Sequence, residues 1–171
     1  MSITSREKSM SPAAVLSVFG IFVVLSGARA AQTDFNADTR AATVALQRYY
    51  NAQGLWDTVG WWNAANCIDA LENDIVVNHD TNYLATLQKT FALNCRSNFL
   101  TGAYDDEGWW AEAWIRAYDL TGNRKYLAAA KVVFADLTTA WDEHCGGGIW
   151  WNSARTYKNA IPNELFLLLA A

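Results

Sequence analysis

Apolar residues recur at helical spacing along most of this chain, and that spacing limits the folds open to it. An i, i+3, i+4, i+7 pattern places such residues on one face of a helix. Helices are predicted for six segments: 42–50, 62–73, 82–93, 110–118, 126–137 and the residues from Pro162 onward. The only other proline is Pro12, so no proline interrupts the interior of the chain. No segment alternates apolar and polar residues over a useful length of strand, and the sequence therefore predicts an all-α domain.

Tryptophan occurs mostly as doublets, and these recur at similar intervals. Gly60-Trp61-Trp62 is followed by Gly108-Trp109-Trp110 and, more loosely, by Gly148-Ile149-Trp150-Trp151. An interval of about 40–50 residues is typical of a repeated helical hairpin, and such hairpins stack into a solenoid or close into a toroid. The alternative is chance recurrence in a chain that contains nine tryptophans.

The end of the chain indicates an incomplete domain. Six helices make three hairpins, and a closed ring of hairpins needs more. The chain stops within residues 164–171, which are apolar after Glu164 and lack a capping glycine, a charged last turn or a polar tail. An apolar helix of this kind needs a neighbour to cover it. We therefore expect about half of a toroid, with the chain ending inside the domain.

The first 30 residues have the pattern of a secretory signal peptide. Arg6 and Lys8 form a basic start, residues 13–25 are apolar, and Ala28-Arg29-Ala30 resembles a cleavage site. The apolar run is shorter than the roughly 20 residues that cross a bilayer, although an uncleaved anchor is the alternative. We expect cleavage, secretion to the extracellular space or cell wall, and no stable membrane span in the remaining domain, residues 31–171.

Charge and cysteine content narrow the possible partners. The net charge is −4 and no basic patch is visible, so nucleic acid is not an expected partner. Cys67, Cys95 and Cys145 allow at most one internal disulfide, and the pairing stays open. The cysteines and the two histidines lack the spacing of metal ligands, so no metal site is expected.

Residues 104–110 place adjacent carboxylates, Asp105 and Asp106, beside the indoles of Trp109 and Trp110. Pairs of carboxylates hydrolyse glycosidic bonds, one as acid/base and the other as nucleophile or base. Flat aromatic faces with a polar edge suit the apolar faces of sugar rings. Neighbours inside a regular helix point to different faces, so we place the pair at a helix start or in the preceding loop. The alternative is an ordinary acidic helix cap.

Further aromatic and polar residues are candidates for contact with a sugar. Core packing is the usual fate of tryptophan on a helix, but we expect at least one member of each doublet to face a groove. The predicted substrate-binding residues are Trp62, Asn63, Tyr104, Trp109, Trp110, Asp142, Trp150, Lys158 and Asn159.

Four blocks of the sequence together resemble glycoside hydrolase family 76. The blocks are residues 54–66, residues 105–122, residues 141–148 and residues 157–166. The resemblance implies an (α/α)6 toroid without metal or organic cofactor, and retaining endo-acting α-1,6-mannanase activity on mannan as the polysaccharide partner. In the family's adjacent aspartates the nucleophile comes first, which implies Asp105 as nucleophile and Asp106 as acid/base.

Three functions stay open. The resemblance favours hydrolysis of the α-1,6-mannan backbone through a covalent mannosyl-enzyme. A cell-wall mannan transglycosylase would use the same residues, because the acceptor is chosen by the shape of the groove. The third possibility is a non-catalytic mannan-binding or wall protein, in which the aspartate pair only caps a helix.

Overall fold

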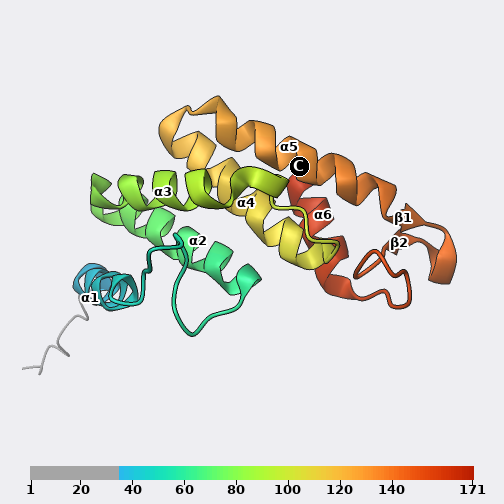
Figure 1. Ribbon diagram of the computed structural model, residues 1–171, viewed down its shortest axis with the longest axis horizontal. Coiled ribbons are helices and arrows are strands. Elements are labelled where there is room, and N and C mark those ends of the chain that lie inside the picture. Colours follow the sequence, from blue (N-terminus) through green and yellow to red (C-terminus); the bar gives the residue numbers. More distant parts are fainter. Residues whose placement is uncertain (1–34) are drawn as a thin grey trace, which may run out of the picture. The chain divides into compact units, whose positions relative to one another are not determined.

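The computed structural model describes residues 35–171, and the predicted signal peptide, residues 1–30, lies outside the described residues. Six α-helices are present in the described part, as predicted, with short 3₁₀ helices and one β-ribbon between them (Figure 1). In chain order the elements are α1 (Phe35–Gln47), α2 (Trp61–Asn78), η1 (Thr81–Tyr83), α3 (Leu84–Asn94), η2 (Cys95–Ser97), α4 (Tyr104–Thr121), α5 (Arg124–Thr139), β1 (Trp141–Asp142), η3 (His144–Gly146), β2 (Gly148–Ile149) and α6 (Ala160–Ala170). None of the described helices is both long enough and apolar enough to cross a membrane.

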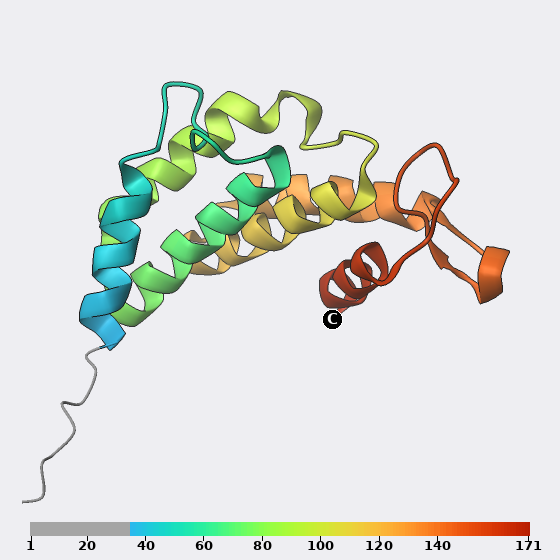
Figure 2. The same cartoon turned by 90° about the horizontal axis from the view of Figure 1, so that it is seen from below.

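The helices form two alternating sets. The even-numbered helices pack side by side, α2 against α4 and α4 against α6. The odd-numbered helices flank them: α1 packs against α2, and α5 runs alongside α4 (Figures 1 and 2). Helix α3 reaches α4 and α5 through Phe91, whose ring packs edge-on against Trp114 and Tyr126. Alternation of this kind is what stacked helical hairpins produce.

An aromatic cluster forms the centre of the core. Phe99, Trp110, Trp114 and Tyr126 are fully or almost fully buried. The Trp114 ring lies 5.1 Å from Phe99, 5.6 Å from Trp110 and 5.3 Å from Tyr126, measured between centroids. Such pairs contribute about 0.5–1.5 kcal/mol each beyond the burial of their apolar surface. The cluster therefore fixes α4, which carries the aspartate pair, against its neighbours.

Gly108 permits the close approach of α4 and α6. A Cβ atom at this position would lie 2.9 Å from the Cβ of Leu165, closer than side chains tolerate. Leu165 is the buried side of α6, while Leu167 and Leu168 are exposed. As predicted for an apolar helix at the end of the chain, α6 is covered along one side only.

The three tryptophan doublets do not occupy equivalent positions. Gly60 is the N-cap of α2, Gly108 lies in the second turn of α4, and Gly148 begins β2. The helical hairpins are present, but the repeated tryptophan doublets do not mark equivalent positions in successive hairpins. The sequence also missed the ribbon, because strands of two residues are too short to show alternation.

Helices α2 and α4 are joined by Arg116. This residue of α4 forms an ion pair with Asp69 and donates from Nη2 to the Asn73 amide oxygen at 2.6 Å. Its Nε atom lies 3.9 Å from Glu72, whose side chain is fully buried. Burial raises the pKa of Glu72 to about 9, against the opposing effect of the Arg116 charge. Glu72 is therefore protonated at neutral pH, and Asp69 supplies the counter-charge of Arg116.

Candidate active site

Asp105 and Asp106 lie in the first turn of α4. Unpaired backbone N–H groups at a helix start favour negative charge, and Ala103 at the N-cap offers no side chain to satisfy them. Both aspartates are partly exposed, whereas Tyr104 and Glu107 on either side of them are buried. The prediction that the pair lies at a helix start is confirmed.

The two carboxylates have different surroundings. Asp105 accepts one hydrogen bond at each oxygen: Oδ1 from the Asp106 backbone N–H at 3.0 Å, and Oδ2 from the Trp151 indole N–H at 2.6 Å. Burial, followed by the charge of Asp105, raises the pKa of Asp106. The geometry thus pairs a carboxylate that is hydrogen-bonded at both oxygens with a neighbour whose pKa is raised.

Glu107 anchors the segment that leads into the pair. Its Oε1 atom accepts the backbone N–H of Thr101 at 2.7 Å and that of Gly102 at 2.6 Å. Burial raises the pKa of Glu107 to about 7; the two backbone N–H groups lower it, and the charge of Asp136 with its hydrogen bond raises it. A buried side chain thereby fixes the backbone immediately before the aspartates.

The loop after β2 pairs with this same segment. Tyr104 donates its backbone N–H to the carbonyl of Trp151 at 2.9 Å, and Ser153 donates to the carbonyl of Gly102 at 2.8 Å. Ala103 and Asn152 form an isolated antiparallel bridge between these contacts. The pairing brings Trp151, 46 positions along the chain, against Asp105.

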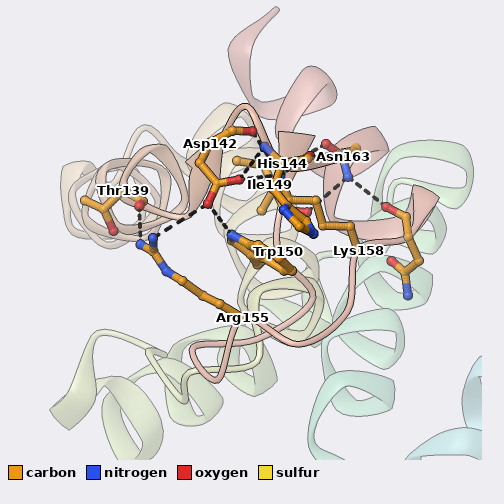
Figure 3. A network of polar contacts seen from close by, with 9 residues as sticks. Thr139, Asp142, His144, Ile149, Trp150, Arg155, Lys158 and Asn163 are labelled. Carbon is orange, nitrogen blue, oxygen red and sulfur yellow. Dashed lines mark hydrogen bonds and ion pairs between the residues drawn. The ribbon is translucent and has the colours of Figure 1, made fainter. Parts of the chain in front are cut away.

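Asp142 is the centre of a polar network that holds the loop (Figure 3). It accepts the Trp150 indole N–H at 2.7 Å and the Lys158 ammonium at 2.7 Å. These two donors, with the His144 backbone N–H, lower the pKa of Asp142 to about 2. Arg155 approaches Asp142 at 3.9 Å and donates to the Thr139 carbonyl at 2.8 Å, which ties the loop to the end of α5.

The Lys158 ammonium already makes all its hydrogen bonds within this network. The prediction that Lys158 binds the substrate is therefore corrected. Its ammonium group donates to the Asp142 carboxylate, the Asp142 carbonyl and the His144 carbonyl, and an ammonium has three protons. The side chain is 8% exposed. The Asn159 carbonyl accepts the Asn163 side-chain amide at 2.7 Å. Asn163 in turn accepts the backbone N–H of Ile149 in β2, so Asn159 also helps to hold the loop (Figure 3).

Three predicted aromatic ligands are buried, and the structure corrects their assignment. Trp110 has no exposed surface, and Tyr104 and Trp150 are 6% and 7% exposed. A sugar ring cannot stack on a face that other side chains cover, so these rings pack the core and the loop. In the last doublet the exposed member is Trp151, at 40%, which the sequence reasoning did not select.

Trp62 and Trp109 form a partly exposed aromatic pair beside the aspartates. Their ring centroids are 6.2 Å apart and their planes differ by 28°. Trp109 is four residues after Asp105, so both lie on the same side of α4. Trp109 also borders a hollow of about 290 Å³ between α4 and α6, lined further by Glu112, Ile161 and Glu164. Contact of Trp62 and Trp109 with substrate stays a prediction. The Asn63 side chain accepts the Gly60 backbone N–H at 3.1 Å and so closes the cap of α2.

Sequence comparisons identify a family and relatives named as mannan endo-1,6-alpha-mannosidases. A family model described as Glycosyl hydrolase family 76 matches residues 34–171. Mannan endo-1,6-alpha-mannosidase DFG5 of Saccharomyces cerevisiae is 30% identical over 151 residues, which cover 72% of this chain and 33% of the relative. The protein of the same name in Candida albicans is 27% identical over 176 residues, covering 81% of this chain and 38% of the relative. The chain thus spans well under half the length of these relatives.

Solved structures show the same helical arrangement. The GH76A alpha-1,6-mannanase from Salegentibacter sp. HEL1_6 superposes with a TM-score of 0.74 at 21% identity, covering 80% of this chain and 44% of that one. An inactive variant of that enzyme, with two consecutive aspartates replaced by alanine, has been solved with alpha-1,6-mannotetrose and gives a TM-score of 0.73. The likeness confirms the predicted fold class: the described helices correspond to about half of an (α/α)6 toroid.

Proposed function

Because the chain belongs to glycosyl hydrolase family 76, we propose that it carries the catalytic residues of a retaining endo-α-1,6-mannanase, with Asp105 as nucleophile and Asp106 as acid/base. The observation that carries this proposal is the difference between the two carboxylates. Asp105 accepts a hydrogen bond at each oxygen, which orients its carboxylate as a nucleophile requires, while the pKa of Asp106 is raised, which suits a proton donor.

The bacterial relative supports this choice of residues. Its variant with two consecutive aspartates replaced is inactive and was solved with α-1,6-mannotetrose. In the present chain Asp105-Asp106 is the only pair of consecutive aspartates. A substrate that binds a variant without these carboxylates is held by other groups, which in this chain we take to include Trp62 and Trp109.

The proposed reaction has two steps. In the first, an Asp105 oxygen attacks the anomeric carbon, the glycosidic C–O bond breaks, and the Asp106 proton passes to the departing oxygen. In the second, water attacks the anomeric carbon and gives its proton to Asp106, while the ester electron pair returns to Asp105. Two inversions at one carbon leave the configuration of the product retained.

The first 30 residues support a proposal about location. Their basic start, apolar run and Ala-Arg-Ala sequence fit a cleaved signal peptide. We infer that the domain is secreted, where it meets an extracellular or cell-wall polysaccharide.

The test is product release from linear α-1,6-mannan. The protein is assayed both as this 171-residue chain and with any sequence that flanks it in its native organism. We expect Asp105→Asn to reduce turnover by roughly 10⁴-fold or more while mannan binding persists, since the nucleophile is lost but the aromatic surface is not. Asp106→Asn should slow natural substrate far more than an aryl mannoside, whose leaving group needs no proton. Asp38→Asn, an exposed change on α1, is the matched control.

Retained turnover in the Asp105→Asn variant that carries its native flanking sequence would refute the assignment of Asp105 as nucleophile. Mannan binding by every form without product from any of them would instead indicate a binding or wall protein. Early NMR spectra of the reducing end distinguish the stereochemistry, and a β-configured first product would exclude the retaining mechanism.

A further inference from the structure

We propose that Trp151 is a positioning residue for the Asp105 nucleophile and acts through its indole N–H. This role rests on the function proposed above. The contact itself joins two distant parts of the chain: the Nε1 atom of Trp151 lies 2.6 Å from Oδ2 of Asp105. Hydrogen bonds to a carboxylate are shorter and stronger than hydrogen bonds to a neutral acceptor.

The two donors together set the orientation of the carboxylate. The Asp106 backbone N–H holds Oδ1 at 3.0 Å, and the Trp151 indole holds Oδ2. With one donor on each oxygen, the carboxylate plane is fixed about its last bond. Each oxygen keeps a further lone pair, so an oxygen is still available for attack on the sugar.

The loop holds Trp151 in a defined place. Its carbonyl accepts the Tyr104 backbone N–H and its own N–H donates to the Tyr157 carbonyl, both at 2.9 Å. The neighbouring Trp150 is buried and bonded to Asp142, and Lys158 lies 4.7 Å above the Trp150 ring. An indole has a single donor, and here it is directed at Asp105. The polar network of Asp142 therefore serves to present one N–H group to the nucleophile.

The bond has different consequences for the two steps. Asp105 loses its negative charge when the C–O ester bond to the sugar forms, and regains it when water breaks that bond. A donor at Oδ2 stabilises the departing carboxylate in the second step and orients the attacking one in the first. Removal of the N–H should therefore slow breakdown of the mannosyl-enzyme more than its formation.

Replacement of Trp151 by phenylalanine tests this role, because it removes the donor and keeps an aromatic face. In the protein extended by its native flanking sequence, with α-1,6-mannan as substrate, we expect kcat to fall roughly 10- to 100-fold, because one charge-assisted hydrogen bond is lost. We expect KM to fall with it, because the covalent intermediate accumulates. Acid quenching followed by mass spectrometry should then show a mannosyl adduct on the peptide that contains Asp105.

Two comparisons separate this role from simple stacking or folding. Trp141→Phe changes an exposed tryptophan in β1 and should leave kcat and KM unchanged. Trp151→Ala removes both the donor and the ring. If Trp151→Phe keeps kcat within about twofold while Trp151→Ala loses it, the ring stacks on sugar and the positioning role is wrong. A fall in kcat at unchanged KM, without an adduct, would also overturn the role in the second step.

The contact can be measured without any activity. In a ¹H–¹⁵N spectrum the Trp151 indole resonance should lie downfield of the exposed Trp141 indole, and Asp105→Asn should move it upfield. An unmoved resonance would refute the contact in solution. A moved resonance in a protein without mannanase activity would refute the proposed function and leave the contact standing.

Discussion

Replacement of buried Glu72 by glutamine should change how stability depends on pH. Burial raises the pKa of Glu72 from 4.5 to about 9, while the charge of Arg116 opposes this and those of Asp69, Glu112 and Asp119 add to it. Between these pH values the folded protein holds a proton that the unfolded chain has released. The free energy of unfolding therefore falls as pH rises from 4.5 to 9, and the contribution of the neutral carboxyl is complete below 4.5.

The size of the effect follows from the two pKa values. A rise from 4.5 to about 9 corresponds to roughly 6 kcal/mol, at about 1.4 kcal/mol per pH unit. Local opening and entry of water relieve part of this, so we expect a loss of about 2–4 kcal/mol between pH 5 and pH 9. Glutamine keeps the shape of the neutral acid and has no proton to lose, so Glu72→Gln should lack that loss.

Urea unfolding at pH 5, 7 and 9 measures the difference directly. Wild type and Glu72→Gln should agree within about 1 kcal/mol at pH 5, and the variant should be the more stable at pH 9. Glu164→Gln, on the exposed side of α6, controls for the loss of one carboxylate. Parallel pH profiles for wild type and Glu72→Gln would refute the assignment of Glu72 as a neutral buried acid.

Two further changes test the scaffold of the site. Glu107→Ala leaves the Thr101 and Gly102 N–H groups without their acceptor, and should lower the free energy of unfolding by about 2–4 kcal/mol at pH 6. Glu107→Gln keeps an oxygen at that place and should lower it by less than half as much. Urea unfolding of both variants measures the difference. Lys158→Met removes the ammonium that joins Asp142 to the His144 carbonyl. Hydrogen exchange should become faster across residues 141–158 and stay unchanged in α2. Exchange in the loop at the wild-type rate would show that the network does not restrain it.

The helices follow from the sequence because their apolar faces are decided locally. Segment 110–118 lies within α4, and segment 126–137 within α5, since each stripe has a core to pack against. Gly122 ends α4 with a left-handed φ of 68°, and its N–H caps the Tyr118 carbonyl. The prediction of a helix over 42–50 is less accurate. Helix α1 ends at Gln47, and Ala42 and Ala45 of the predicted apolar face are exposed in the described chain.

The placement of individual site residues could not be predicted in the same way. Trp109 and Trp110 are identical in type, yet their neighbours bury Trp110 and leave Trp109 partly exposed. Periodicity along α4 alone does not say which face meets α2 and α6. For the loop residues 150–158 there is no periodicity at all, and their positions are set by hydrogen bonds with segment 102–104 and with the end of α5.

Asp142 and Lys158 show why chemically suggestive residues outside a helix need not contact a ligand. A long loop must satisfy its backbone and side-chain polar groups, and charged residues with several bonds do so most effectively. Here they hold the loop in place, and the loop in turn presents the Trp151 N–H to Asp105. The two carboxylates are consecutive residues of α4, but the donor at Oδ2 of Asp105 comes from a segment more than 40 positions away. The aspartate pair alone therefore indicates a reaction class, and Asp105 has a hydrogen bond at both oxygens only with the loop in place.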